Sequence, residues 1–208
     1  MDSKQVNKVI KLELTPLLIS NNFNRISDRR YIKITDNYYY GIEIKSVGKY
    51  FSDVTGWPSQ TISSFGGLFC RLIKPRFELK NGLPEEGNYH FRVENICGLN
   101  QDFNTKKLTN LAERKRKDLW WIDDYSNLQN IISDLKESIV NNSINYFNKF
   151  IYGEDLIQNV EEMKDCFNKY WDAYYLYKSL NKESETNKYK IKLINESKRI
   201  GYKELTDL

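Results

Sequence analysis

The chain has 208 residues, of which 40% are hydrophobic, 29% charged and 14% aromatic, and its formal net charge is +4. This balance is typical of a globular chain that buries a core, and it argues against intrinsic disorder. The three cysteines, Cys70, Cys97 and Cys166, lack the paired spacing of a disulfide framework or a zinc site. Because no signal-like segment follows the N-terminus and no run of about 18 apolar residues occurs, we expect a cytoplasmic protein with no membrane partner.

Residues 1–22 are predicted to form a helix. Apolar residues recur at helical spacing between Val6 and Leu18. Pro16 predicts either a kink or the start of a second short helix, where its missing N–H is no loss. Asn21 and Asn22 tolerate a left-handed backbone, so we expect the helix to end there.

Residues 23–122 are predicted to form mainly a sheet. Tyr31–Ile34 and Tyr38–Val47 are strand-like, and the second places Tyr and Ile on one face. Asp36 and Asn37 between them are typical of a two-residue hairpin turn. The resulting register predicts two favourable cross-strand charge pairs, Arg30 with Glu43 and Asp28 with Lys45.

Three further strands are expected, at 68–74, 87–96 and 119–122. Gly66 and Gly67 are interpreted as a break before the first of them. The second alternates cleanly, so its side chains should point inward at Tyr89, Phe91 and Val93 and outward at His90, Arg92 and Glu94.

Residues 124–208 are predicted to be helical. The first helix has a weak point at 141–143, and a continuous apolar stripe from Leu156 to Tyr177 predicts a second helix. A polar linker at 181–188 should precede a last helix over 189–208. The order of helix, about five strands and helices predicts one α+β domain over 1–208, with helices packed on one face of an antiparallel sheet.

His90 is the only histidine, so there is no multi-histidine metal site, and any Ser-His-Asp or Cys-His catalysis would have to use this one residue. We interpret His90 as a solvated or hydrogen-bonded residue of a strand face, with general acid–base work as the alternative. The Gly66-Gly67 pair lacks the spacing of a nucleotide-binding loop, so we expect no cofactor.

A metal-dependent hydrolase or nuclease is a weaker hypothesis. Glu43 and Lys45, with Asp36 upstream, are similar to the Asp…Glu-x-Lys pattern in which two carboxylates hold Mg²⁺. On one strand, however, Asp36 and Glu43 would lie roughly 23 Å apart, too far to share an ion. We therefore expect no metal site and no catalytic residue.

The positive charge is concentrated within the polar excursion at 98–118. The segment 106–118 carries a net charge of +4, which equals that of the whole chain. Its cations could contact phosphates, and Trp120 and Trp121 just beyond could stack on bases, although core packing is the alternative for these rings. This nucleic-acid-associated function is an alternative hypothesis that uses Arg114, Lys115, Arg116 and Lys117.

The segment 48–58 contains three large aromatic side chains, Tyr50, Phe51 and Trp57. These rings are unfavourable in water, so the predicted aromatic loop either covers one end of the core or presents an apolar recognition patch. The second interpretation makes these three residues candidate binding residues for a protein partner.

Several short motifs resemble the bacterial family called domain of unknown function 4304. They are Leu14-Thr15-Pro16-Leu17-Leu18, Val47-Gly48-Lys49-Tyr50-Phe51-Ser52, Thr55-Gly56-Trp57-Pro58 and Leu119-Trp120-Trp121-Ile122. The resemblance covers about 6–151, and the chain departs from it at Asn22, where relatives often have Gly, and in the inserted basic segment 100–117.

The resemblance implies a bacterial cytoplasmic α+β domain and contributes no catalytic residue. Some small bacterial families of this kind lie among toxin–immunity clusters, so an immunity-like binder is a hypothesis by association. Our first hypothesis is therefore a non-enzymatic protein-interaction domain whose partner is a protein.

Overall fold

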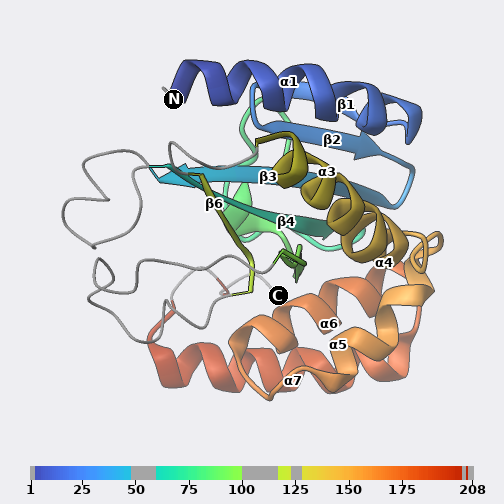
Figure 1. Ribbon diagram of the computed structural model, residues 1–208. Helices are drawn as coiled ribbons and strands as arrows, with labels where there is room; N and C mark the ends of the chain where they lie inside the picture. The colour runs from blue at the N-terminus through green and yellow to red at the C-terminus, as the bar shows by residue number, and fades with distance from the viewer. Residues whose placement is uncertain (1–2, 48–59, 100–116, 123–127, 203–204, 206–208) are drawn as a thin grey trace. The chain divides into compact units, whose positions relative to one another are not determined.

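The computed structural model describes residues 3–47, 60–99, 117–122, 128–202 and 205. These residues form an α+β fold, as predicted (Figure 1). The strands are β1 (Asn24–Ser27), β2 (Arg30–Ile34), β3 (Tyr38–Val47), β4 (Gln60–Cys70), β5 (Phe91–Glu94) and β6 (Leu119–Ile122). The α-helices are α1 (Ser3–Ser20), α3 (Leu128–Ser138), α4 (Asn145–Phe147), α5 (Ile157–Glu162), α6 (Phe167–Ser179) and α7 (Glu183–Ile200). Two short 3₁₀ helices are η1 (Glu86–Asn88) and η5 (Gly153–Leu156), and a π-helix is η4 (Ile139–Ile144).

The chain folds into two compact units, each assembled from stretches that are far apart in the sequence. The first unit comprises Met1–Ile34, Tyr40–Leu68 and Phe91–Asn148. The second unit comprises Thr35–Tyr39, Phe69–His90 and Lys149–Leu208.

The sheet is antiparallel, with strand order β1-β2-β3-β4-β5, and β6 also pairs with β4. The predicted two-residue turn is confirmed, because the Thr35 N–H donates to the Tyr38 carbonyl at 2.9 Å. The predicted charge pair between Arg30 and Glu43 is also present, at 2.9 Å. Asp28 forms an ion pair with Arg25.

The inward face of β3 is confirmed, since the four side chains predicted to point inward are buried. In the first unit, α3 packs against α1 and β6, and η4 packs against β5. Trp120 and Trp121 are both buried, and the Trp120 Nε1–H donates to the Asp134 carboxylate at 2.7 Å. Core packing therefore accounts for both rings. The buried residues of the β3 face are Tyr38, Tyr40, Ile42 and Ile44.

The prediction for β4 was wrong at both ends. The strand begins at Gln60, runs through Gly66 and Gly67, and ends at Cys70. A Cβ on Gly66 would lie 2.6 Å from the Ser143 Oγ and 2.7 Å from the Phe147 ring. Gly66 therefore marks a place where side chains of a helical segment approach the strand closely.

The predicted weak point at 141–143 is a π-helix. Residues five apart share a face in this geometry, because its hydrogen bonds run from i to i+5. Ser138 and Ser143 are both buried as a result. The Ser138 Oγ accepts from the Ile96 N–H at 2.6 Å, and the Ser143 hydroxyl donates to the Asn95 Oδ1 at 2.7 Å. The two hydroxyls thus bind the residues that directly follow β5.

Two of the helical predictions need correction: the continuous second helix and the polar linker. Helix α1 is continuous through Pro16, and Asn22 (φ 65°) is left-handed, as expected after its end. The stripe from Leu156 to Tyr177 is divided, because α5 ends at Glu162 and α6 begins at Phe167. The predicted linker at 181–188 is mostly helix, since α7 begins at Glu183, and Asn181 (φ 56°) is the left-handed residue of the short turn before it.

Candidate functional site

Most of the binding residues predicted from the sequence lie outside the described part of the chain. These are Tyr50, Phe51, Trp57, Arg114, Lys115 and Arg116. Lys117 is described: its side chain is exposed, and its carbonyl accepts from the Cys97 N–H at 2.6 Å, two residues before β6 begins. The binding roles of all seven residues stay predictions.

The second unit contains a cluster of three ionisable side chains, two of which are fully buried. His90 directly precedes β5, Arg76 follows β4, and Asp172 lies in α6. The His90 Nε2 is 3.9 Å from the Asp172 Oδ1, and the Arg76 guanidinium is 3.8 Å from the Asp172 Oδ2. The side chains of His90 and Asp172 have no exposed surface. The His90 ring stacks on Phe69 with centroids 4.7 Å apart.

The hydrogen bond that the imidazole accepts at Nδ1 fixes its tautomer. The Cys70 backbone N–H donates to the His90 Nδ1 at 2.9 Å, so this nitrogen carries no proton. The neutral ring therefore holds its proton on Nε2, which faces the Asp172 carboxylate. Protonating Nδ1 would break the bond to Cys70, which opposes the charged form.

Burial sets the protonation of the cluster. Burial, and then the positive charge of Arg76, lower the pKa of His90 to about 3. Burial raises the pKa of the Asp172 carboxyl to about 7, and Arg76 opposes that rise. At neutral pH the imidazole is neutral, and Asp172 is close to the midpoint of its titration.

The cluster lies inside the second unit, where the His90 Nε2 and both Asp172 carboxylate oxygens have no hydrogen-bond partner among the described residues. Both ring nitrogens of His90 face protein atoms. The outward orientation predicted for His90 is wrong, because β5 begins one residue later, at Phe91. Its predicted hydrogen-bonded structural role agrees with the bond from Cys70. Sequence reasoning missed Arg76 and Asp172, although an acidic residue between Trp171 and Ala173 in the apolar stripe was a signal.

The residues of the hydrolase hypothesis are used in structural contacts. The Glu43 carboxylate pairs with Arg30, and the Lys45 ammonium lies 5.5 Å from the centroid of the Phe65 ring. Within the described ranges, no group of three or more His, Cys, Asp or Glu side chains could hold a metal ion.

The three cysteines are free thiols. Burial raises the pKa of Cys70 to about 12 and that of Cys97 to about 11. We expect iodoacetamide at mildly alkaline pH to modify Cys70 only after unfolding, because the thiolate is the reactive form. Mass spectrometry of peptides measures the modification of Cys70 in native and in urea-treated protein. The urea-treated protein is also the control, because all three cysteines should react there. Equal modification of Cys70 in both samples would contradict the expectation.

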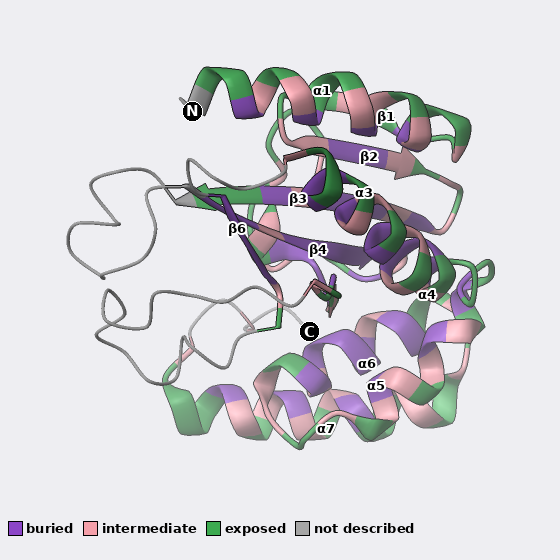
Figure 2. Cartoon of the chain, in the orientation of Figure 1, coloured by how far each residue is buried: buried purple, intermediate pink, exposed green. Residues whose placement is uncertain are grey.

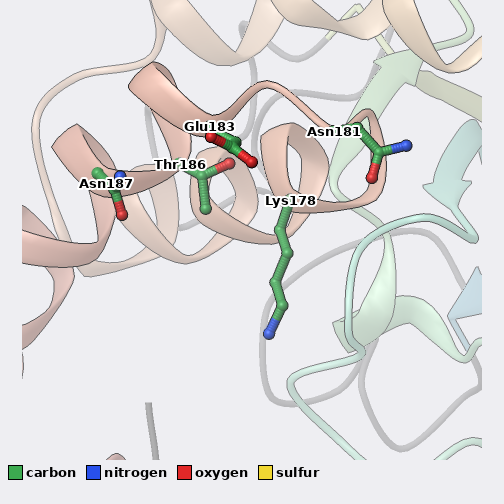
Figure 3. Close-up of a pocket in the computed structure, with 5 residues that line it drawn as sticks. All are labelled: Lys178, Asn181, Glu183, Thr186 and Asn187. Carbon is green, nitrogen blue, oxygen red and sulfur yellow. The ribbon is translucent and has the colours of Figure 1, made fainter.

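A polar pocket of about 330 Å³ lies at the turn between α6 and α7 (Figure 3). Two of its lining side chains are bonded locally: the Lys178 ammonium donates to the Tyr174 hydroxyl at 3.3 Å, and the Thr186 hydroxyl donates to the Lys182 carbonyl at 2.7 Å. Charges of both signs line it, so it favours no single class of ligand. The remaining lining residues are Asn181, Glu183 and Asn187.

The outer face of α1 is an exposed surface of the first unit. Figure 2 shows an exposed stripe along this helix and a buried stripe opposite it. Leu12 is 60% exposed and Ile19 is 58% exposed, seven residues apart on one face. Both residues fall outside the apolar stripe that predicts the helix, so that stripe does not indicate them. Their spacing of two turns was the available signal.

No family model, no curated protein and no solved structure matches this chain. Among the described residues, no helix is long and apolar enough to cross a membrane.

Proposed function

We propose that this chain is a non-enzymatic protein-interaction domain, immunity-like in kind, that acts in the bacterial cytoplasm. One observation carries the proposal: the exposed face of α1 holds two large aliphatic side chains that no described element covers. Exposed aliphatic residues aligned on one helix face are typical of helix-mediated recognition. The bacterial and cytoplasmic parts rest on the sequence and on its resemblance to domain of unknown function 4304.

Two further features support an interaction role. The only histidine is buried with both ring nitrogens facing protein atoms, so it is unavailable for acid–base chemistry. The predicted aromatic loop offers a second candidate surface, through Tyr50 and Trp57.

A pulldown with three forms of the full chain tests the proposal. We expect wild-type protein to capture a protein partner from the cells that make it, and at least one of two double variants, Leu12→Ser with Ile19→Ser or Tyr50→Ala with Trp57→Ala, to lose that partner. Ile151→Ser is the matched control, because Ile151 is a similarly exposed aliphatic residue of the second unit. If both double variants keep every partner of the wild type, the proposal fails.

A further inference from the structure

We infer that the outer face of α1 binds an acidic amphipathic helix of a partner protein. This inference rests on the proposed function and names the chemistry of the partner. The face combines three exposed lysines with two exposed aliphatic residues, Leu12 and Ile19. The three lysines are Lys4, Lys8 and Lys11.

The positions of these residues place them on one continuous surface. Lys4 and Lys8 are one turn apart, Leu12 follows one turn later, and Ile19 follows two turns beyond that. At about 1.5 Å per residue, the surface from Lys4 to Ile19 is roughly 22 Å long. This length matches four turns of a partner helix.

The charge of the face is uncompensated within the described residues. Glu13 is the only acidic residue of α1, and its carboxylate is bonded to Lys136 at 2.6 Å. None of the three exposed lysines forms an ion pair with a described residue. A partner with carboxylates opposite them would gain electrostatic complementarity and faster association.

Lys4 is not explained by the stability of the helix. The first turn of α1 contains no acidic residue and contains Lys4. The positive end of the helix dipole lies there, so a lysine in this turn destabilises the helix. A residue that breaks a local rule without a structural gain is a candidate for function.

The aliphatic residues distinguish among ligands that carry negative charge. A nucleic-acid backbone would engage the lysines but would offer no apolar group to Leu12 and Ile19. A membrane-surface helix needs a broad apolar face beside its cations, and the opposite apolar stripe of α1 is already buried in the first unit. An acidic helix with aliphatic side chains at heptad spacing satisfies both parts of the surface.

Fluorescence anisotropy with a labelled synthetic helix tests the inference. The probe has Leu at heptad a and d positions and Glu at the other positions, and the control peptide has Lys in place of Glu. We expect saturable binding of the acidic peptide that weakens with added salt, and roughly tenfold weaker binding by Leu12→Ser with Ile19→Ser. Binding of the acidic peptide should be abolished in the triple variant Lys4→Glu, Lys8→Glu, Lys11→Glu. It should persist in Lys198→Glu, which changes an exposed lysine of α7.

The outcomes separate this inference from the proposed function. No binding of the acidic peptide, or equal binding by the wild type and the α1 variants, overturns the inference. Tighter α1-dependent binding of a DNA duplex or of phosphatidylserine vesicles also overturns it. In each case the proposed function stands if the double variant Tyr50→Ala, Trp57→Ala fails to capture a partner that the wild type captures in the pulldown. Circular dichroism of each variant confirms that the chain is folded.

Discussion

Replacing Asp172 by Asn should make the stability of the protein fall steeply as the pH drops from about 6.5 to about 3. In this variant His90 remains buried and neutral, with a pKa lowered from 6.5 to about 3, while the unfolded chain protonates its histidine. Between these values the unfolded state binds one more proton than the folded state, so stability rises with pH. At 1.36 kcal/mol per pKa unit, the full loss is about 5 kcal/mol.

Replacing His90 by Gln should give the opposite slope. The glutamine carbonyl can still accept from the Cys70 N–H, and Asp172 keeps a pKa raised from 3.8 to about 7. The folded state then holds a proton that the unfolded state has released, so stability falls as the pH rises from about 4 to about 7. The expected loss is about 4 kcal/mol over this window.

In the wild-type protein the two effects cancel between about pH 4 and 6.5. The unfolded chain carries one proton on His90, and the folded chain carries one on Asp172. Both states therefore bind the same number of protons, and the pair contributes no slope. Urea unfolding monitored by circular dichroism across this range measures all three proteins, and the double variant gives the slope that the other ionisable groups contribute. If stability changed with pH in the same direction in both single variants, the protonation states assigned to His90 and Asp172 would be wrong.

The outline of the sheet was predictable because local rules decide it. Alternation in Tyr38–Val47 and the turn at Asp36 and Asn37 fixed the face and the register, and the ion pair of Arg30 with Glu43 confirms the register. A one-residue shift would move the aliphatic set to the other face, so few alternatives existed.

The cluster around Asp172 was not predictable, because it depends on contacts between distant segments. Arg76 and Asp172 lie far apart in the sequence, and no local pattern indicates that they meet at His90. The interruption between α5 and α6 was hidden for a similar reason, since the apolar stripe keeps its spacing across it. Tertiary packing decides such features, and propensity is only a weak guide to them.

The role of Gly66 was not predictable from the sequence either, because its close neighbours, Ser143 and Phe147, are distant in the sequence. In an open strand, replacing glycine by alanine stabilises a protein by roughly 0.5–1 kcal/mol, because alanine has less freedom in the unfolded chain. At Gly66 the new Cβ would lie 2.6 Å from the Ser143 Oγ and 2.7 Å from the Phe147 ring. Steric overlap at these distances exceeds the entropic gain, so we expect Gly66→Ala to destabilise by about 2 kcal/mol.

The neighbours of Gly66 have little freedom to move away. Ser143 is completely buried and bonded to Asn95, and the Phe147 ring lies 5.1 Å from the Tyr40 ring. Gly87→Ala is the matched control, because its Cβ would meet only Phe77, at 3.7 Å. Urea unfolding followed by tryptophan fluorescence measures both variants, and adding Ser143→Gly to Gly66→Ala should recover part of the loss. If Gly66→Ala were as stable as Gly87→Ala, the helix would approach the sheet less closely than the structure indicates.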